Sequence, residues 1–241
     1  MSTHGSIKRI LTLAIVAAIF SIPVAGLGQN SFNIDLDCEF CPPEGGGGRP
    51  SSSFFAAAGP DQAGFWNLLD ASGDPPTRLR NLAGELTDMI VSGPTSGVEG
   101  GNNFQGQPDN RFLMNDFRQV ASSSTWTFDG VPSGNYIVIS YAVYPWHESS
   151  YNPTPVTVTG GGTKLVTGPM AVDQFIEGRT HVTHFIQVSN GSFSIRVDRG
   201  QFYSGAVNGF QIVSVVPEPS LVVGMTTGLL ALSMRRRRKP S

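Results

Sequence analysis

The chain has few of the side chains that catalytic sites use most, with two cysteines and four histidines among 241 residues. It also lacks a nucleophile elbow, a helical zinc-binding motif, a phosphate-binding loop and a dinucleotide fingerprint. His181 and His184 share one predicted strand, where alternation places them on opposite faces and prevents them from acting as a pair. His147 and Glu148 are adjacent in a predicted loop, but neighbouring side chains usually diverge. The sequence therefore predicts a protein that is not an enzyme and has no cofactor.

The two cysteines, Cys38 and Cys41, lie in an acidic segment that ends in four consecutive glycines. Two thiols are too few ligands for a metal site. A thioredoxin-like redox motif needs a helix N-terminus in a βαβ unit, which this segment does not predict. In an oxidising compartment a disulfide is the expected state, with free thiols as the alternative, and so small a loop adds little stability. Residues 29–50 are predicted to form a flexible leader.

Positive charge is scarce in the middle of the chain. Residues 29–216 contain nine Lys or Arg and 17 Asp or Glu, a net charge of −8, although the whole chain carries only −2. An acidic surface of this size repels phosphates, which excludes nucleic acid as a partner. Asp70, Asp74 and Asp173 are hard ligands of the kind that Ca²⁺ takes. No calcium-loop spacing joins them, so no metal site is predicted.

Long helical periodicity is also absent from the middle of the chain, and only Thr77 to Glu85 could form a short helix. β-Branched and aromatic residues instead predict strands at residues 135–144, 156–159, 181–188, 192–198 and 208–216. Asn190-Gly191 between two alternating runs predicts a hairpin, because both central positions of a type I′ turn need positive φ. This pattern favours an all-β domain over residues 51–216, a jelly-roll-like β-sandwich of about eight strands.

The segment 144–155 is the predicted binding surface. Tyr144, Trp146 and Tyr151 stand there among prolines. Loops on a rigid sandwich commonly carry function, and flat amphipathic rings suit stacking on the faces of sugars. The alternative is that Trp146 caps one end of the core.

The N-terminus has the pattern of a secretory signal peptide. Lys8 and Arg9 precede an uncharged run over residues 10–27, and Ala25, Gly26 and Gly28 are small enough for cleavage. We therefore expect residues 1–28 to direct Sec export and to be removed by signal peptidase. An uncleaved membrane anchor is the alternative, because the run is nearly long enough to span a bilayer.

The C-terminus carries a second apolar segment flanked by cations. Pro217-Glu218-Pro219 ends the folded domain, because proline does not fit inside regular strands or helices. The 14 residues from Leu221 to Met234 make a helix of about 21 Å against a hydrocarbon core of about 30 Å. Snorkelling cations can extend so short a span. We expect a transmembrane helix at about 220–234, followed by the stop-transfer charges Arg235, Arg236, Arg237, Arg238 and Lys239.

Positive charge lies at the outer end of both apolar segments. By the positive-inside rule, both termini are cytoplasmic while the chain is in transit through the inner membrane. The domain between them is therefore predicted to lie outside the cytoplasm.

The order of Pro217-Glu218-Pro219, an apolar segment with Gly224 and Gly228, and a basic end resembles the PEP-CTERM sorting signal. The resemblance covers residues 216–241. It implies that an exosortase, an intramembrane transpeptidase-like enzyme, cleaves near this motif and transfers or releases the domain at the cell surface.

Short strand signatures at Gly64 to Leu68, Phe128 to Val138 and Val207 to Ile212 resemble galactose-binding-like jelly rolls found ahead of PEP-CTERM tails. The resemblance implies saccharide binding through end loops. The predicted function is thus an exported, non-catalytic protein of the cell surface or extracellular matrix. A carbohydrate-binding module of the envelope or exopolysaccharide is the alternative, and a glycan-active hydrolase, which needs two convergent polar residues in a cleft, is a third.

Overall fold

The computed structural model describes residues 30–36, 50–51, 53–69, 76–94, 98–100, 108–144, 152–169, 174–201 and 204–215. The elements are β1 (Phe32–Leu36), β2 (Trp66–Leu69), β3 (Thr77–Arg80), β4 (Leu86–Ser92), β5 (Val98–Gly100), α2 (Pro108–Asn115), β6 (Asp116–Val120), β7 (Ser123–Asp129), β8 (Gly134–Tyr141), β9 (Thr154–Val158), β10 (Gly162–Val166), β11 (His181–Val188), β12 (Ser192–Asp198), β13 (Gly205–Val207) and β14 (Gly209–Val215).

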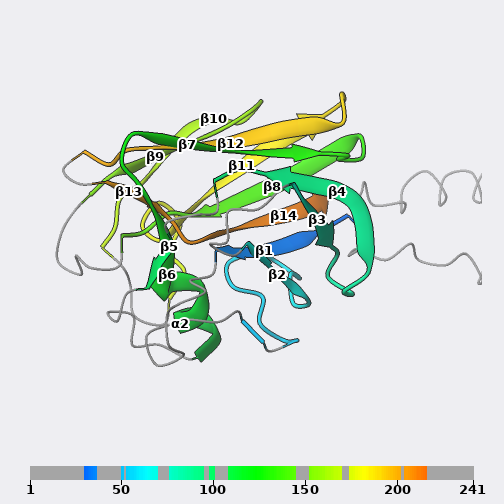
Figure 1. Cartoon of the computed structure of the whole chain (residues 1–241), viewed down its shortest axis with the longest axis horizontal. Coiled ribbons are helices and arrows are strands. Elements are labelled where there is room, and N and C mark those ends of the chain that lie inside the picture. Colours follow the sequence, from blue (N-terminus) through cyan, green and yellow to red (C-terminus); the bar gives the residue numbers. More distant parts are fainter. Residues whose placement is uncertain are drawn as a thin grey trace, which may run out of the picture.

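These strands form a β-sandwich, which confirms the predicted all-β class. Sheet A has the strand order β11-β8-β14-β1-β2, and sheet B has the order β10-β9-β12-β7-β4-β3. The two sheets lie face to face, and a small third sheet, β13-β6-β5, lies with α2 at one end (Figure 1). All strand pairs are antiparallel except β1 and β2, among the strands that the structure describes.

Five predicted strands are present as β8, β9, β11, β12 and β14 with small shifts of their ends, but the predicted short helix is wrong. Thr77 to Glu85 forms β3 and a turn, in which Asn81 Oδ1 accepts hydrogen bonds from two backbone N–H groups. Leu79 is buried while both its neighbours are exposed, so the segment has the period of a strand. Among the described residues a helix occurs instead at α2, which begins at Pro108, where a proline suits the first turn.

The predicted Asn190-Gly191 hairpin is also wrong. β11 pairs with β8 in sheet A, whereas β12 pairs with β7 and β9 in sheet B. Gly191 has a φ of 78°, but Asn190 does not have positive φ, so the turn is not type I′. The turn carries the chain from one sheet to the other. The alternating pattern fits a hairpin and a crossing between sheets equally well, because in both arrangements each strand buries one face in the shared core.

The domain begins earlier than predicted. Residues 32–36 fall inside the expected flexible leader, yet they form β1, which lies in sheet A between β14 and the edge strand β2. All five residues of β1 are buried. Three apolar side chains, Phe32, Ile34 and Leu36, face the core, so burial outweighs the acidic composition of the segment. The rest of the predicted leader, residues 37–49, lies outside the described residues.

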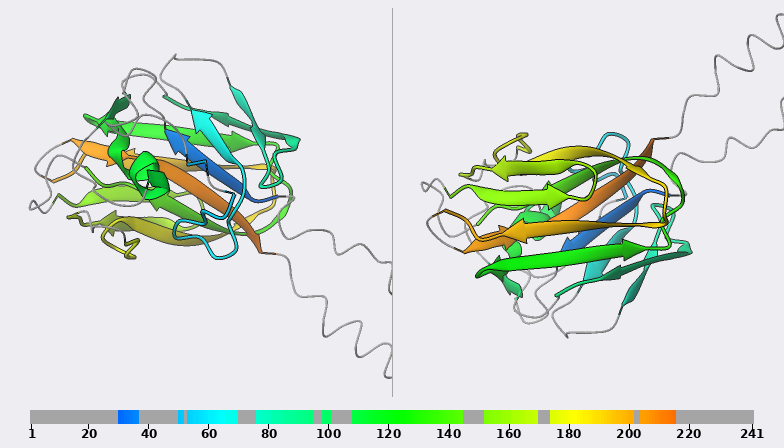
Figure 2. Two further views of the ribbon diagram at one scale, coloured as in Figure 1. Left: turned by 90° about the horizontal axis from the view of Figure 1, so that it is seen from below. Right: turned by 90° about the horizontal axis from the view of Figure 1, so that it is seen from above.

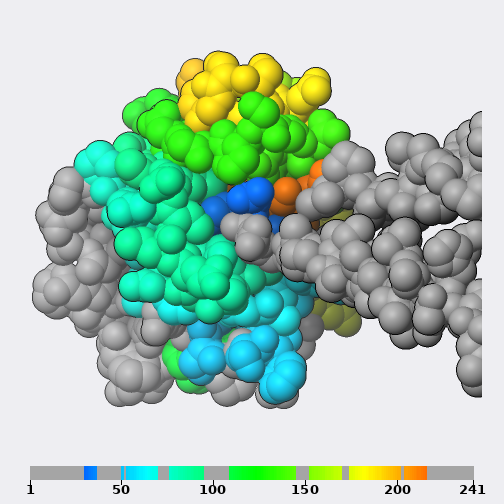
Figure 3. Space-filling view, turned by 90° about the vertical axis from the view of Figure 1, so that its right-hand side faces the viewer, coloured from blue at the N-terminus to red at the C-terminus, as the bar shows by residue number. Residues whose placement is uncertain are grey.

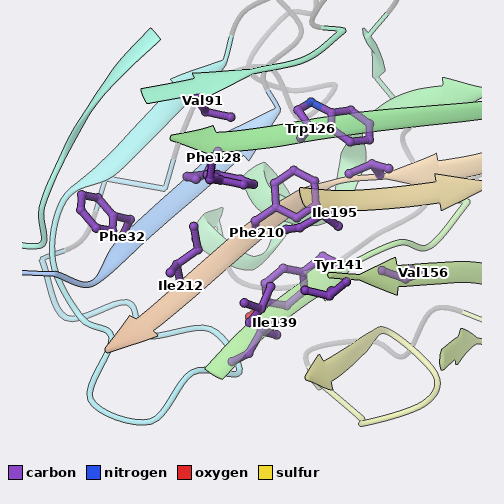
Figure 4. Packing of buried hydrophobic residues seen from close by; sticks show 14 of the residues in the cluster. Phe32, Val91, Trp126, Phe128, Ile139, Tyr141, Val156, Ile195, Phe210 and Ile212 are labelled. Atoms are coloured by element: carbon purple, nitrogen blue, oxygen red, sulfur yellow. The ribbon is translucent and has the colours of Figure 1, made fainter. Parts of the chain in front are cut away.

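The core lies between the two sheets. Trp126 and Phe128 of β7 contact the ring of Phe210 of β14, with ring centroids 5.3 and 6.1 Å apart, and so join sheet B to sheet A. Figure 4 shows these rings together with Ile195 of sheet B and Ile212 of sheet A. Edge-to-face contacts of this kind add stability beyond the area that they bury.

The outer face of sheet A is covered by a second layer, made of residues 53–65 and 174–180. Phe55 stacks on Trp66 and also contacts Phe175, whose ring packs edge-on against Tyr141. Beneath these rings, Gln211 accepts hydrogen bonds from Tyr141 Oη (2.5 Å) and from Gly59 N (2.9 Å). Both faces of sheet A are thus buried over much of its length.

The two ends of the domain lie side by side. Phe32 of β1 is paired with Ile212 of β14, and Ser214 N donates to Ser31 Oγ at 3.0 Å. The start of β1 and the end of β14 therefore lie at the same end of the sandwich, opposite the end that carries α2 and β6 (Figures 1 and 2).

Candidate functional site

Tyr144 is the one predicted binding residue that the structure describes, and it lies at the end of the sandwich away from the chain ends. Its half-buried ring packs edge-on against Phe117, with centroids 5.1 Å apart. Gln119 Nε2 lies 3.5 Å from Tyr144 Oη and donates a hydrogen bond to Ser204 Oγ at 3.0 Å. We call Phe117, Gln119, Tyr144 and Ser204 the end-loop cluster.

The backbone that carries Tyr144 is held by one buried carboxamide. Asn208 Oδ1 accepts a hydrogen bond from Val143 N (2.8 Å), while its Nδ2 donates to the carbonyls of Met114 and Asp116 (3.0 and 3.1 Å). Its carbonyl accepts from Leu36 N at 3.0 Å. Asn208 therefore joins β1, the end of β8, α2 and β6, which fixes the position of the end-loop cluster on the core.

The chain returns to this cluster at Asn152. Its Nδ2 donates to the Ser204 carbonyl at 3.0 Å, and Pro153 O accepts from Gln201 N at 3.2 Å. Both ends of the predicted binding loop are thus anchored beside Ser204. Trp146, Tyr151, His147 and Glu148 lie outside the described residues.

A second polar cluster lies at the edge of sheet A, around β11. Glu177 Oε2 lies 3.1 Å from His181 Nε2 and accepts from Thr183 Oγ1 at 2.7 Å, while Oε1 accepts from Thr183 N at 2.9 Å. Lys164 Nζ donates to the Thr183 carbonyl at 2.5 Å. The exposed backbone groups of Thr183 are therefore capped by two side chains, which blocks strand pairing at this point of the edge.

Thr180, His181 and Glu177 have the order of a hydroxyl–imidazole–carboxylate triad. Thr180 Oγ1 lies 3.1 Å from His181 Nδ1, and Glu177 lies on the other ring nitrogen. Thr180 is fully buried, however, and its hydroxyl also bonds both backbone groups of Ile176. A nucleophile must be reachable by its substrate, so this arrangement serves structure.

The two histidines lie on opposite faces of β11, as the alternation predicts. His184 faces the core side with Val182 and Ile186, whereas His181 packs against Tyr141 on the outer face. Burial lowers the pKa of His181, against the opposing effect of the Glu177 carboxylate. Burial and the nearby Lys164 cation lower the pKa of His184, and Glu177 and the Gly162 backbone only partly oppose this.

The remaining predicted site residues lie outside the described residues. They are Cys38, Cys41, the possible calcium ligands, Pro217, Glu218, Pro219 and Arg235 to Lys239. Within the described ranges, no three His, Cys, Asp or Glu side chains are close enough to hold a metal ion. The helical residues that the structure describes include no segment of the length and apolar character needed to cross a bilayer.

Sequence patterns did not identify Gln119 and Ser204 as partners of Tyr144. They lie 25 residues before it and 60 residues after it in the chain. They meet only because β6 and β13 pair, with Gln119 opposite Ala206. No local motif marks either residue.

No family model matches the chain, and no curated protein matches it. Among solved structures, the extracellular domain of ANXUR1 from Arabidopsis thaliana is 12% identical, with a TM-score of 0.41 over 79% of this chain and 49% of that one. The plant receptor-like kinase FER is 15% identical, with a TM-score of 0.40 over 79% of this chain and 43% of that one. TmCBM61, solved with β-1,4-galactotriose, is 14% identical, with a TM-score of 0.29 over 54% of this chain and 90% of that one.

The chain spans less than half the length of the two plant proteins. All these TM-scores are below 0.5, so the likenesses are partial and say nothing about what this chain binds.

Proposed function

We propose that the protein is an exported, non-catalytic component of the cell surface or extracellular matrix, held by its C-terminal tail and processed there by an exosortase. The observation that carries the proposal is the pairing of the first and last strands, β1 and β14. Both apolar segments of the sequence place their cationic ends on one side of the membrane. A domain whose two ends leave from one place can follow both segments without rearranging its sheet.

The sandwich is a jelly roll in this proposal. The chain passes from sheet B to sheet A between β7 and β8, returns to sheet B at β9, crosses to sheet A at β11 and returns to sheet B at β12. Such alternation between sheets accords with a jelly roll.

Mass spectrometry of the protein recovered from its native host tests the processing. The expected mature chain lacks residues 1–28 and everything after the Pro217-Glu218-Pro219 motif. The matched control carries Pro217→Ala, Glu218→Gln and Pro219→Ala and is expected to keep its tail. A wild-type mature chain that still carries Arg235 to Lys239, in cells that have an exosortase, would refute the proposal.

A second function is favoured by the end-loop cluster, namely binding of saccharides. The half-buried ring of Tyr144 has a carboxamide and a hydroxyl at its rim, a combination that suits one sugar face and its hydroxyl groups. The four residues of the cluster include no carboxylate, whereas a glycosidase uses two.

A glycan array tests this second function with the wild type, Tyr144→Ala and Gln119→Ala. Each variant is expected to lose at least about fivefold in affinity for any glycan bound, because stacking and a hydrogen bond are each worth about 1 kcal/mol or more. Phe185→Ala is the matched control, since Phe185 is an aromatic residue that is 70% exposed on β11. Binding that is unchanged in both variants would exclude the cluster as the site.

A further inference from the structure

The end of the sandwich at which β1 begins and β14 ends carries exposed apolar side chains. Its rim comprises β3 and β4 with the turn between them, the β7–β8 turn, the β11–β12 turn and the end of β14. Leu86 is 51% exposed and Val215 is 40% exposed, so two large apolar side chains face solvent here. Figure 3 looks at this end of the molecule, where β3 and β4 lie beside the start of β1. We call it the chain-end surface.

Charge on the chain-end surface is nearly balanced, unlike the charge of the domain. Arg78 and Arg80 are on β3, Glu85 and Asp88 follow on the turn and β4, and Asp129 ends β7. Arg78 forms an ion pair with Asp88 at 2.7 Å. These five groups sum to −1, whereas residues 29–216 carry −8. The strongly acidic character of the domain therefore lies mostly elsewhere.

The chain between this surface and the apolar segments is short. Ser31 is four residues from Leu27, and Val215 is six residues from Leu221. Fully extended, these connections reach about 14 and 21 Å. The headgroup layer takes up about 5–8 Å of that length on each side of the bilayer. While the tail spans the membrane, the chain-end surface stays within about 15 Å of the headgroups, which is within about two Debye lengths.

We propose that the chain-end surface is a lipid-contact surface, which rests on the headgroups of the outer leaflet while the C-terminal segment is inserted. This inference rests on the membrane insertion in the proposed function. An exposed aliphatic side chain beside an arginine, as Leu86 is beside Arg80 across β3 and β4, suits the boundary between headgroups and acyl chains. Low local negative charge reduces repulsion from anionic lipids. The end-loop cluster is then held at the far end of the sandwich, away from the membrane.

The test uses the full-length chain with Cys38→Ser and Cys41→Ser, reconstituted into vesicles of phosphatidylethanolamine and phosphatidylglycerol. A fluorophore is attached through Ser133→Cys on the chain-end surface or through Ser122→Cys at the opposite end, both exposed turn positions. The labels are separated by the length of β7, roughly 20 Å. A lipid with a nitroxide headgroup is expected to quench the label at 133 at least twofold more than the label at 122.

A spacer of Gly and Ser inserted between Val215 and Val216 separates lipid contact from mere tethering. With the spacer, the label at 133 is expected to remain more strongly quenched than the label at 122. This difference is expected to disappear when Leu86→Asp is added and to remain with the control Leu165→Asp. Leu165 is 47% exposed on β10, away from this surface. Equal quenching at both labels in vesicle-bound protein, or loss with the spacer alone, would overturn the inference while leaving tail insertion intact. Protein that does not sediment with vesicles would overturn both.

Discussion

Single buried carboxamides position much of this molecule. Gln211 and Asn208 lie in or beside β14, and both are fully buried. Gln211 Nε2 donates to Asn33 Oδ1 at 2.8 Å and to the Ala56 carbonyl at 3.0 Å, so both ends of its amide have partners. A buried polar network in which every group is paired specifies one arrangement, because any other arrangement leaves a polar group unpaired.

Tyr141→Phe tests this network. Tyr141 Oη donates to Gln211 Oε1 and accepts from Ala58 N at 2.8 Å, so its removal takes two hydrogen bonds from the network, although Gln211 Oε1 keeps the one from Gly59 N. We expect the free energy of unfolding in urea to fall by about 2–3 kcal/mol. Tyr136→Phe is the control, since the Tyr136 hydroxyl donates one hydrogen bond, to the Pro132 carbonyl. It is expected to cost only about 0.5–1.5 kcal/mol. Equal losses of unfolding free energy in the two variants would show that the network around Gln211 adds no stability beyond one ordinary hydrogen bond.

Acidification should destabilise the fold through His184. Its pKa in the folded state is lowered, so the unfolded state binds more protons once the pH falls below the ordinary value of about 6.5. Stability is therefore full above that pH and falls below it, until the pH reaches the lowered folded-state pKa. Urea unfolding at a series of pH values measures this loss. His184→Leu should make it smaller, and an unchanged pH profile in that variant would assign the effect elsewhere.

At the scale of elements, two turn glycines meet backbone constraints that the alternation of the strands does not reveal. Gly130 and Gly160 both have positive φ, 70° and 79°. A Cβ at Gly130 would lie 2.4 Å from the Asp88 carbonyl oxygen, whereas a Cβ at Gly160 has nothing within 4 Å. Gly160 is needed for its positive φ alone. Gly130 is needed for its positive φ and also because the backbone of β4 lies so close to it.

Replacing each glycine by alanine separates the two causes. Gly160→Ala should cost about 1–2 kcal/mol of unfolding free energy, the price of a left-handed residue. Gly130→Ala adds a backbone clash and should cost about 3 kcal/mol or more. Thermal or urea unfolding of the two variants gives the comparison. If the two costs agree, the contact with Asp88 is not a constraint.

For the molecule as a whole, β1 decides where the domain begins. Its three core side chains contribute roughly 5–9 kcal/mol at about 1.5–3 kcal/mol each, comparable to the total stability of a typical domain. Without β1, the facing edges of β14 and β2 would also be unpaired.

A chain of residues 30–215 should therefore fold cooperatively, whereas residues 51–215 should not. Near-ultraviolet circular dichroism and a urea unfolding curve distinguish a packed domain from a collapsed one. The shorter chain is expected to lack both the near-ultraviolet signal and a sigmoidal transition. A cooperative transition of similar midpoint in both chains would contradict the central role of β1.

Much of the sandwich could be predicted because period-two alternation directly marks a strand with one buried face. The strand positions of β8, β11, β12 and β14 follow from it. The site could be predicted only in part. The aromatic loop marks Tyr144 as a candidate, but Gln119 and Ser204 are distant in the chain and carry no local signal. β1 was missed because its acidic flanks resemble a solvated leader, although Asp35 itself is fully buried.

By itself, the sequence determined the all-β class, the positions of most long strands and the acidic character of the region between two apolar, cation-flanked ends. Only the tertiary structure decided which sheet each strand joins, that β11 and β12 separate at Asn190-Gly191, and that the first and last strands of the domain lie together. The reason is physical. Alternation specifies which face of a strand is buried, but the same buried face can be satisfied by many partners. The partner is selected by contacts such as Asn208 with β6 and Trp126 with Phe210, which join residues far apart in the chain.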